Sequence, residues 1–237
     1  MSAARDRFRS EIPRYYAWRL HLAVDLIVPA AVIAFAVSRL GPLTGWEAAA
    51  FPIGVLLANA GEYVLHRYPL HRPLWPRFAY DRHAVVHHAY FTHRDMGMDS
   101  MRDLRWVLFP AFTVPGLVLL MIPIALAAGA LVSANTGWMT LIVTAGYYLL
   151  YELLHTSYHL PARSWVGRRR MIRYLRRLHQ THHDPVLMDV CNFNVTFPIT
   201  DALVGTWRRE VRGEPVLRPA MTGATTARPP RAPDSSP

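Results

Sequence analysis

Four long apolar segments, separated by polar and strongly basic stretches, dominate the hydropathy pattern of this chain. They cover residues 22–38, 43–65, 106–133 and 138–154. A helix needs about 20 mostly apolar residues to cross a bilayer, so all four are long enough, the first and the last only marginally. Buried helices of a soluble protein are the alternative, but four uniformly apolar segments favour membrane helices. The pattern predicts an all-α integral membrane bundle of about four transmembrane helices.

The third segment and the connection after it carry finer information. Pro110, Pro115 and Pro123 predict kinks in the third helix, or a broken or re-entrant helix. The short polar stretch ANTG, residues 134–137, separates the third and fourth segments. So short a connection predicts an antiparallel helical hairpin with its turn at these residues.

Arginines set the expected orientation of the bundle. They concentrate before the first apolar segment, between residues 66 and 105, and after residue 160, whereas the two other loops contain only Arg39. With four spans, the three basic regions and both termini lie on one side of the membrane, which the positive-inside rule makes cytoplasmic. The net charge of +10 also makes nucleic-acid binding an alternative to consider. Arginines that flank apolar segments do not form a dense basic stripe, so no nucleic-acid partner is expected.

Composition divides the chain into three regions. Residues 1–20 form a polar, cytoplasmic N-terminal segment, and residues 21–207 form the membrane domain. Residues 208–237 are rich in proline, arginine, serine and threonine, which predicts a disordered tail without a catalytic role. Cys191 is the only cysteine, so an intrachain disulfide cannot form.

Ten of the twelve histidines fall into two similar halves, each placed after an apolar segment. The first half reads His66-x4-His71 and His83-x3-His87-His88, and the second reads His155-x3-His159 and His179-x2-His182-His183. Residues three or four apart share one face of a helix. The pairs predicted to converge on this basis are His83 with His87, His155 with His159, and His179 with His182 or His183. Adjacent histidines such as His87 and His88 diverge by about 100°, which suits two neighbouring metals.

The number of imidazoles exceeds what one ion accepts, so the pattern predicts a site for two metal ions. With four spans, both halves emerge at the same, cytoplasmic membrane boundary, within reach of a lipid chain. Haem ligation in a bundle needs only two or four histidines, generally deep in the spans. A metal-buffering tract is low in complexity rather than helically spaced. Imidazole binds iron, zinc, copper and nickel alike, so the spacing leaves the metal open.

Two membrane-depth carboxylates are candidates for orienting the histidines. Ligating imidazoles usually donate their second N–H to a carboxylate or a carbonyl. Glu62 lies four residues before His66, and Glu152 lies three before His155, on the same helical face in each case. A carboxylate at that depth is costly unless it is paired, which favours a supporting role beside the metal ligands.

Other polar residues can be explained without a role beside the metal ligands. Asn192 and Asp201, with Asp189, could orient the last histidine box, or they could cap helices and turns. His21 and Asp25 stand four residues apart at the start of the first span. We interpret them as an interfacial pair that satisfies itself.

The arrangement HX4H, HX3HH, HX3H and HX2HH over four apolar segments resembles the fatty acid hydroxylase superfamily, which includes sterol desaturases and C4-methyl oxidases. The stretch NFNVTFPITDALVGT, residues 192–206, is similar to the N-F-G…P…D…G-T stretch that follows the last histidine box in that superfamily. The resemblance covers roughly residues 55 to 207. Two departures are Asn194, where the family usually has glycine, and His93, which lies outside the usual boxes and outside our ligand set.

The resemblance implies a membrane-bound non-haem di-iron oxygenase. It implies two iron ions on the ten histidines, with zinc as an alternative in the isolated protein, and O2 as co-substrate. The reaction would be hydroxylation or desaturation of a lipid C–H bond. A separate ferredoxin or cytochrome b5-type protein would supply the electrons. Carotenoid hydroxylation is the nearest alternative activity.

Two other classes of protein are alternatives. A membrane metal-binding or transport protein without oxygenase activity would carry polar residues along the middle of its spans, whereas these spans are polar mainly at one end. A di-zinc hydrolase would carry a general base in a motif such as HExxH, which this sequence lacks. The sequence demands no general acid or base, and we assign no catalytic residue beyond the metal ligands.

Overall fold

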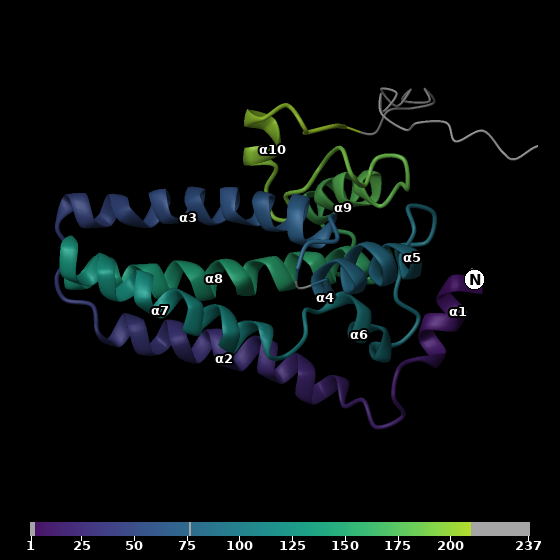
Figure 1. Ribbon diagram of the computed structural model, residues 1–237, viewed down its shortest axis with the longest axis horizontal. Helices are drawn as coiled ribbons and strands as arrows, with labels where there is room; N and C mark the ends of the chain where they lie inside the picture. The colour runs from purple at the N-terminus through teal and green to yellow at the C-terminus, as the bar shows by residue number, and fades with distance from the viewer. Residues whose placement is uncertain (1–2, 76, 210–237) are drawn as a thin grey trace, which may run out of the picture.

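The computed structural model describes residues 3–75 and 77–209, and the regular elements within them are all helices. Four long helices run side by side (Figure 1): α2 (Trp18–Ser38), α3 (Gly45–Leu65), α7 (Thr113–Leu131) and α8 (Ala134–His159). Short elements gather towards one end and form what we call the cap: α1 (Ala3–Ser10), α4 (Phe78–Tyr80), α5 (His88–Tyr90), α6 (Leu104–Val107), α9 (Arg170–His182) and α10 (Ile199–Leu203). The predicted all-α bundle with a histidine-rich cap is confirmed.

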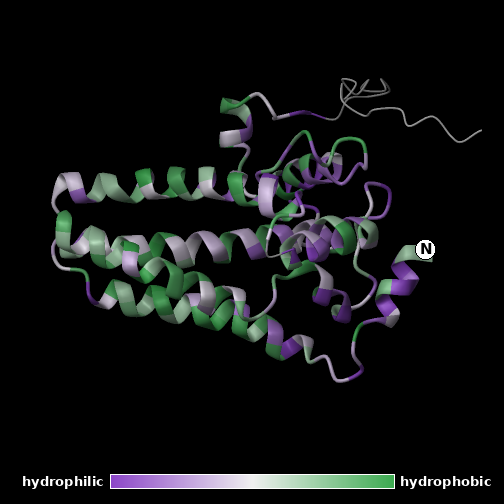
Figure 2. Cartoon of the chain, in the orientation of Figure 1, coloured by the Kyte–Doolittle hydropathy of each residue, from purple (hydrophilic) through white to green (hydrophobic). Residues whose placement is uncertain are grey.

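Three of the long helices are long and apolar enough to cross a membrane by themselves: α2, α3 with its continuation to Leu70, and α7. Many of their side chains are exposed, among them Leu57, Leu119 and Leu126, as expected of surfaces that face lipid. The fourth helix, α8, packs against all three and buries more of its side chains than any other helix in the described residues. It can be less apolar because much of its surface faces protein. Figure 2 shows the contrast between the apolar bundle and the polar cap.

The hairpin between α7 and α8 is tighter than the sequence predicts. The hydroxyl of Ser133 accepts a hydrogen bond from the backbone N–H of Thr136 at 3.2 Å and so caps α8. Residues 134–137 are therefore the first turn of α8 and not a loop, which corrects our prediction. A Cβ atom at Gly137 would lie 2.7 Å from the carbonyl oxygen of Ala125, so glycine lets α7 and α8 cross closely.

The prolines of the third apolar segment act in different ways. The segment is broken, because α6 ends at Val107 and α7 begins only at Thr113. Pro110 lies in the break, Pro115 lies in the first turn of α7, and Pro123 lies inside that helix. A proline in a first helical turn removes an N–H that has no partner within the helix. The broken-helix alternative is the one that the structure adopts, and the break becomes part of a cavity described below.

The cap loop between residues 91 and 106 is held by the N-terminal helix. The buried guanidinium of Arg5 donates hydrogen bonds to the carboxylate of Asp95 and to the carbonyl oxygen of Gly97. Arg9 donates to the carboxylates of Asp99 at 2.5 Å and Asp103 at 3.1 Å. Charge-assisted hydrogen bonds of this kind fix the loop firmly. The loop matters because it supplies backbone carbonyls to the histidines.

Candidate metal centre

The ten predicted histidines are all buried, and all lie where the long helices meet the cap. Those of the first half occupy the π-helical turn η1 (His66–Leu70), which continues α3, the residue that follows it, and the π-helical turn η2 (Asp81–His87) with α5. Those of the second half occupy the last turns of α8 and of α9, together with the residue that follows α9. Segments more than 100 positions apart in the chain therefore contribute to one site.

The imidazoles form two groups. In the first histidine group, one nitrogen from each member lies within 4.8 Å of the others, and the members are His66, His71, His83, His88 and His182. The second histidine group meets the same condition with His87, His159, His179 and His183. His155 adjoins the second group, because its Nε2 atom lies 3.3 Å from Nε2 of both His87 and His159. The structure thus brings together all ten predicted histidines, whose role as ligands stays a prediction.

The first group depends on π-helical spacing. In a π-turn the hydrogen bonds run between residues five apart, which aligns such residues on one side. His66 with His71, and His83 with His88, are two such pairs, and each pair lies in the first group. The predicted convergence of His83 with His87 is corrected, because His87 joins the second group although the two rings stack at 5.1 Å. The predicted divergence of His87 and His88 is as observed.

The second group depends on ordinary α-helical spacing. His155 with His159, and His179 with His183, are four residues apart on α8 and α9. Each half also lends one histidine to the other group. His182 comes from the second half but joins the first group, and His87 comes from the first half but joins the second. This exchange ties the two halves of the chain together at the site.

Hydrogen bonds to the Nδ1 atoms of the histidines determine whether their Nε2 atoms carry a proton. Backbone carbonyl oxygens accept from the Nδ1 atoms of five histidines: Phe193 from His66, Trp106 from His87 (2.7 Å), Met96 from His159 (2.9 Å), Cys191 from His182 (2.9 Å) and Phe91 from His183. Nδ1 of His71 lies 3.3 Å from the carboxylate of Asp189. A carbonyl can only accept, so in these five rings Nδ1 carries the proton and Nε2 keeps its lone pair. Those lone pairs face the interior of the groups, which is what metal coordination needs.

Burial keeps the imidazoles neutral. It lowers the pKa of His87 to about 3 and of His182 to about 4, and together with the neighbouring histidines it lowers the pKa of His71 to about 2. Neutral imidazole is the form that binds a metal. Buried, neutral, convergent nitrogen donors with oriented outer N–H groups fit a pair of metal ions.

Glu62 supports the site through a loop. Its two carboxylate oxygens accept from the backbone N–H groups of Val195 (2.6 Å) and Thr196 (2.9 Å), and from the hydroxyl groups of Tyr147 and Thr196, both at 2.6 Å. The donors around Glu62 in the described residues are therefore not the imidazole of His66, which we expected from their spacing. Glu62 instead anchors the segment whose Phe193 carbonyl receives the His66 N–H.

Asp201 and Asn192 anchor the same segment. The Asp201 carboxylate is fully buried and accepts from the backbone N–H groups of Phe193 at 3.0 Å and Asn194 at 2.6 Å. Asn192 has a φ of 56°, a left-handed conformation that asparagine tolerates. Its side-chain amide donates to the carbonyl of Leu178 at 3.1 Å. Both residues therefore shape the backbone next to the last histidine box.

Glu152 lies apart from the imidazoles. Its Oε1 atom accepts from the backbone N–H of Phe109 at 2.9 Å and from the hydroxyl of Tyr148 at 3.0 Å. The expected hydrogen bond to His155 is not among the contacts of the described residues. His93 belongs to neither histidine group, in agreement with its exclusion from our ligand set.

A cavity of about 720 Å³ connects the bundle with the metal centre. His66, His83, His87 and His155 line its cap end, so both histidine groups reach it. The remainder of its wall is mostly apolar and comes from α3, α7, α8 and the break before α7. The sequence gives no signal for this cavity, because side chains from segments distant in the chain form its wall.

An apolar helical bundle whose cap gathers ten buried histidines, nine of them in two groups, fits a membrane protein with a metal-binding site. The family model described as fatty acid hydroxylase matches residues 51–206, about two thirds of the chain. The chain belongs to the fatty acid hydroxylase family, and membership implies oxidoreductase activity and suggests a membrane di-iron oxygenase. No curated protein and no solved structure gives a match.

The match agrees with the predicted resemblance over residues 55–207. The boundaries assigned to the N-terminal segment, to the membrane domain and to the tail stay predictions. Residues 210–237 of the tail lie outside the described residues.

Proposed function

We propose that this protein is a non-haem di-iron oxygenase that hydroxylates or desaturates a C–H bond of a membrane lipid. Both histidine groups line the end of one apolar cavity that runs into the bundle, and this observation carries the proposal. The cavity presents an apolar chain to a buried metal site and keeps bulk water away.

The two histidine groups would hold one iron each, with His155 beside the second. When bound, the iron pair supplies the reductive activation of O2. The chain's own contribution is to hold the imidazoles neutral, to orient them through the carbonyls of the two flanking loops, and to position the lipid. Two electrons come from a separate one-electron carrier of the ferredoxin or cytochrome b5 type.

The shape of the cavity supports an extended lipid chain as substrate. Its wall includes Thr136 at the far end of α8 and His155 at the cap end. These residues are 19 positions apart, which corresponds to about 28 Å along an α-helix. The hydroxyls of Thr140 and Thr144 donate to the carbonyls four residues earlier, so their polar atoms are already satisfied. A long apolar chain lying along α8 would therefore meet a largely unreactive wall until it reaches the histidines.

The orientation of the protein belongs to the same proposal. The basic regions that flank the spans favour a cytoplasmic cap with cytoplasmic termini. A soluble electron carrier would then reach the metal centre from the cytoplasmic side.

Isotope labelling tests the proposed reaction. The full chain in lipid nanodiscs would be loaded anaerobically with Fe2+, reduced with dithionite-reduced ferredoxin, and exposed to 18O2 in the presence of total lipid from the expression host. We expect one 18O atom in a lipid product for hydroxylation, or a new double bond with 18O only in water for desaturation. Metal-free protein is the control.

Two other outcomes decide against the proposal. Uptake of two irons without lipid oxidation, with either ferredoxin or cytochrome b5 as reductant, would favour a metal-binding or transport protein. Oxidation confined to nanodiscs that contain β-carotene would favour the carotenoid hydroxylase alternative.

Substitution in the cavity wall tests the placement of the chain. Ala58 lines the cavity midway along α3, whereas Ala49 is exposed on the same helix and does not line it. We expect Ala58→Phe to reduce oxidation of long chains more than of short chains, and Ala49→Phe to change neither. Equal loss for both lengths in Ala58→Phe would contradict an extended chain in this cavity.

A further inference from the structure

A row of polar groups crosses the otherwise apolar contact between α2 and α8. The hydroxyl of Tyr16 lies 2.7 Å from Nδ1 of His21. Nε2 of His21 lies 2.7 Å from the carbonyl oxygen of Phe109 and 3.4 Å from a carboxylate oxygen of Asp25. The other oxygen of Asp25 lies 3.4 Å from the hydroxyl of Tyr148, which donates to Glu152 at 3.0 Å. These five residues lie in a row in which neighbouring polar atoms are no more than 3.4 Å apart, and we call this row the Tyr16–Glu152 chain.

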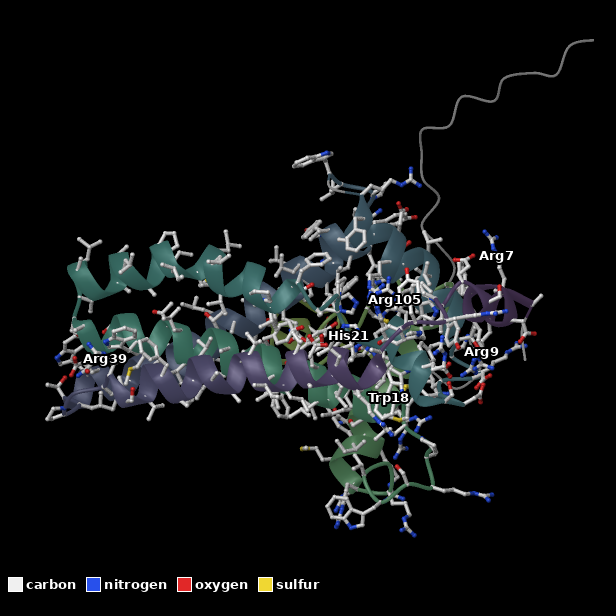
Figure 3. All side chains as sticks on the ribbon, turned by 90° about the horizontal axis from the view of Figure 1, so that it is seen from below. Arg7, Arg9, Trp18, His21, Arg39 and Arg105 are labelled. Atoms are coloured by element: carbon white, nitrogen blue, oxygen red, sulfur yellow. The ribbon has the colours of Figure 1, made fainter. Side chains whose placement is uncertain are left out.

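The chain runs from the surface towards the metal centre. Tyr16 is half-buried and precedes α2, while Asp25 is fully buried within that helix. Figure 3 places His21 where the long helices meet the cap, at the opposite end of the bundle from Arg39. Glu152 stands one helical turn before His155 on α8. Its Oε2 atom and Nδ1 of His155 are both buried, and neither has a hydrogen-bond partner among the described residues.

A structural tie between α2 and α8 does not require this composition. One hydrogen-bonded pair would join the helices, whereas this chain buries two carboxylates and an imidazole within the bundle. Such groups are expensive in a membrane, and rows of Asp, Glu and His in membrane helices characteristically carry protons. Every member of this row can both accept and release a proton through its side chain.

We propose that the Tyr16–Glu152 chain conducts protons from the cap surface towards the metal centre, as far as Glu152, which lies one helical turn before His155. This inference rests on the proposed function, because hydroxylation consumes protons. The balanced reaction is RH + O2 + 2e− + 2H+ → ROH + H2O, with the electrons from the ferredoxin-type carrier. A proton passes from Tyr16 to Nδ1 of His21, and the Nε2 proton leaves the Phe109 carbonyl and passes to Asp25. Tyr148 then relays a proton from Asp25 to Glu152.

The groups that surround the chain are compatible with this role. Burial raises the pKa of Tyr16 to about 12, so its hydroxyl keeps a proton at neutral pH and passes protons by exchange. Burial, together with the charge of Arg105, lowers the pKa of Arg82 to about 10, so Arg82 remains a cation at neutral pH. Arg82 interacts electrostatically with Asp25 and Glu152.

Asp25→Asn is the sharpest variant, because Asp25 lines neither the cavity nor a histidine group. The amide keeps the shape of the carboxylate but cannot relay a proton. We expect iron content and thermal stability close to wild type, at least about a tenfold lower rate of lipid oxidation, and a larger solvent deuterium isotope effect. The matched control is Asp6→Asn, which changes an exposed carboxylate on α1. A wild-type rate and isotope effect in Asp25→Asn would overturn the proposal.

Infrared spectroscopy of the zinc-loaded protein gives a readout that does not depend on activity. After transfer into D2O, a protonated carboxyl band that is missing in Asp25→Asn or Glu152→Gln should shift. We expect the shift to be slowed several-fold in Tyr16→Phe and unchanged in Tyr15→Phe, since Tyr15 is 89% exposed. Exchange in Tyr16→Phe as fast as in wild type would overturn the path.

These measurements separate the two proposals. If wild-type protein transfers no 18O to lipid or water, the oxygenase proposal fails, while the infrared result still tests the path. If Asp25→Asn does not fold, Tyr16→Phe carries both the rate and the exchange measurements. A normal rate together with normal exchange in that variant would then refute the proton path alone.

Discussion

The two histidine groups reach the same kind of site with different backbones. The first group relies on residues five apart in π-turns, and the second on residues four apart in α-helices. The loop whose hydrogen-bond acceptors orient each group comes mostly from the other half of the chain. The loop of residues 189–193 receives N–H groups from His66, His71 and His182, whereas residues 91–106 receive those of the second group. Each histidine group therefore depends on a loop from the other half.

This exchange has a consequence for folding and function. Neither half of the chain contains a complete group with its supporting carbonyls. Changes in the segment after α9 should therefore weaken the first metal position and spare the second. Changes in the loop held by α1 should do the reverse.

Single histidine substitutions on α9 should give the largest effects. His182 and His179 are less than one helical turn apart, yet they belong to the first and second groups respectively. We expect each alanine variant to bind one metal instead of two. Its activity should fall at least about 100-fold, because removing a ligand costs more than removing the hydrogen-bond partner that orients a ligand. Metal analysis of purified protein measures the stoichiometry.

His93→Ala is the matched control, since His93 lies in neither group. It should retain two metals and near-wild-type activity. Loss of both metals in His182→Ala as well as in His179→Ala would show that the groups are not independent positions.

Removing the loop anchor should have a smaller and one-sided effect. Glu62→Gln keeps size but loses acceptor capacity opposite the N–H groups of Val195 and Thr196. The Phe193 carbonyl is then held less well against His66, so we expect metal affinity at the first position to fall about 10- to 100-fold. Competition titration with a chelator measures it. Equal weakening of both positions would contradict the assignment of Glu62 to the 193–196 segment.

The sequence predicted which histidines gather at the site, but it did not predict how they divide into two groups. The repeated histidine pattern singled out the ten imidazoles that the structure brings together, since residues on one helical face converge when the helices pack. Their role as metal ligands stays a prediction. The pattern could not sort the histidines into groups, since nothing in the run His83 to His88 distinguishes a π-turn from an α-helix. Nor could it find the carbonyls of Phe91, Met96 and Trp106, because backbone groups have no side-chain signature.

The fold, too, was predicted from the sequence only in part. Hydropathy located four helices, since burial in lipid imposes long apolar runs. It misplaced the start of α8, because asparagine and glycine in residues 134–137 are typical of turns, whereas the cap at Ser133 begins the helix there. The carboxylates were assigned by spacing alone. Spacing cannot reveal that Glu62 meets a segment more than 130 residues away.

We expect a fall in pH to destabilise the folded protein through both histidine groups. In the unfolded chain a histidine titrates near its ordinary pKa of 6.5, whereas burial lowers the pKa of His87 to about 3 and of His182 to about 4 in the folded protein. Between these values and pH 6.5 the unfolded chain binds more protons, so the free energy of unfolding falls as the pH falls through that range. We expect the metal-free protein to melt several degrees lower at about pH 5 than at about pH 7.5.

Zinc should raise the melting temperature at neutral pH, because it binds the neutral imidazoles of the folded state. A melting temperature independent of pH in the metal-free protein would show that the imidazoles are not buried as described.

The smallest expected effect concerns Asn194, where the family usually has glycine. Its amide nitrogen donates to the carbonyl of Asn59 at 2.9 Å and to Glu62 at 3.2 Å, and its oxygen accepts from the N–H of Asp201 at 3.1 Å. Asn194→Gly removes these bonds, but Glu62 and Asp201 still hold the loop. We expect a loss of about 1–3 kcal/mol in the free energy of unfolding, measured by denaturant titration, with two metals retained. Asn194→Ala separates lost hydrogen bonds from the added freedom of glycine and should account for most of the loss. If Asn194→Gly instead released the first metal, the side chain and not the two carboxylates would be the anchor of this loop.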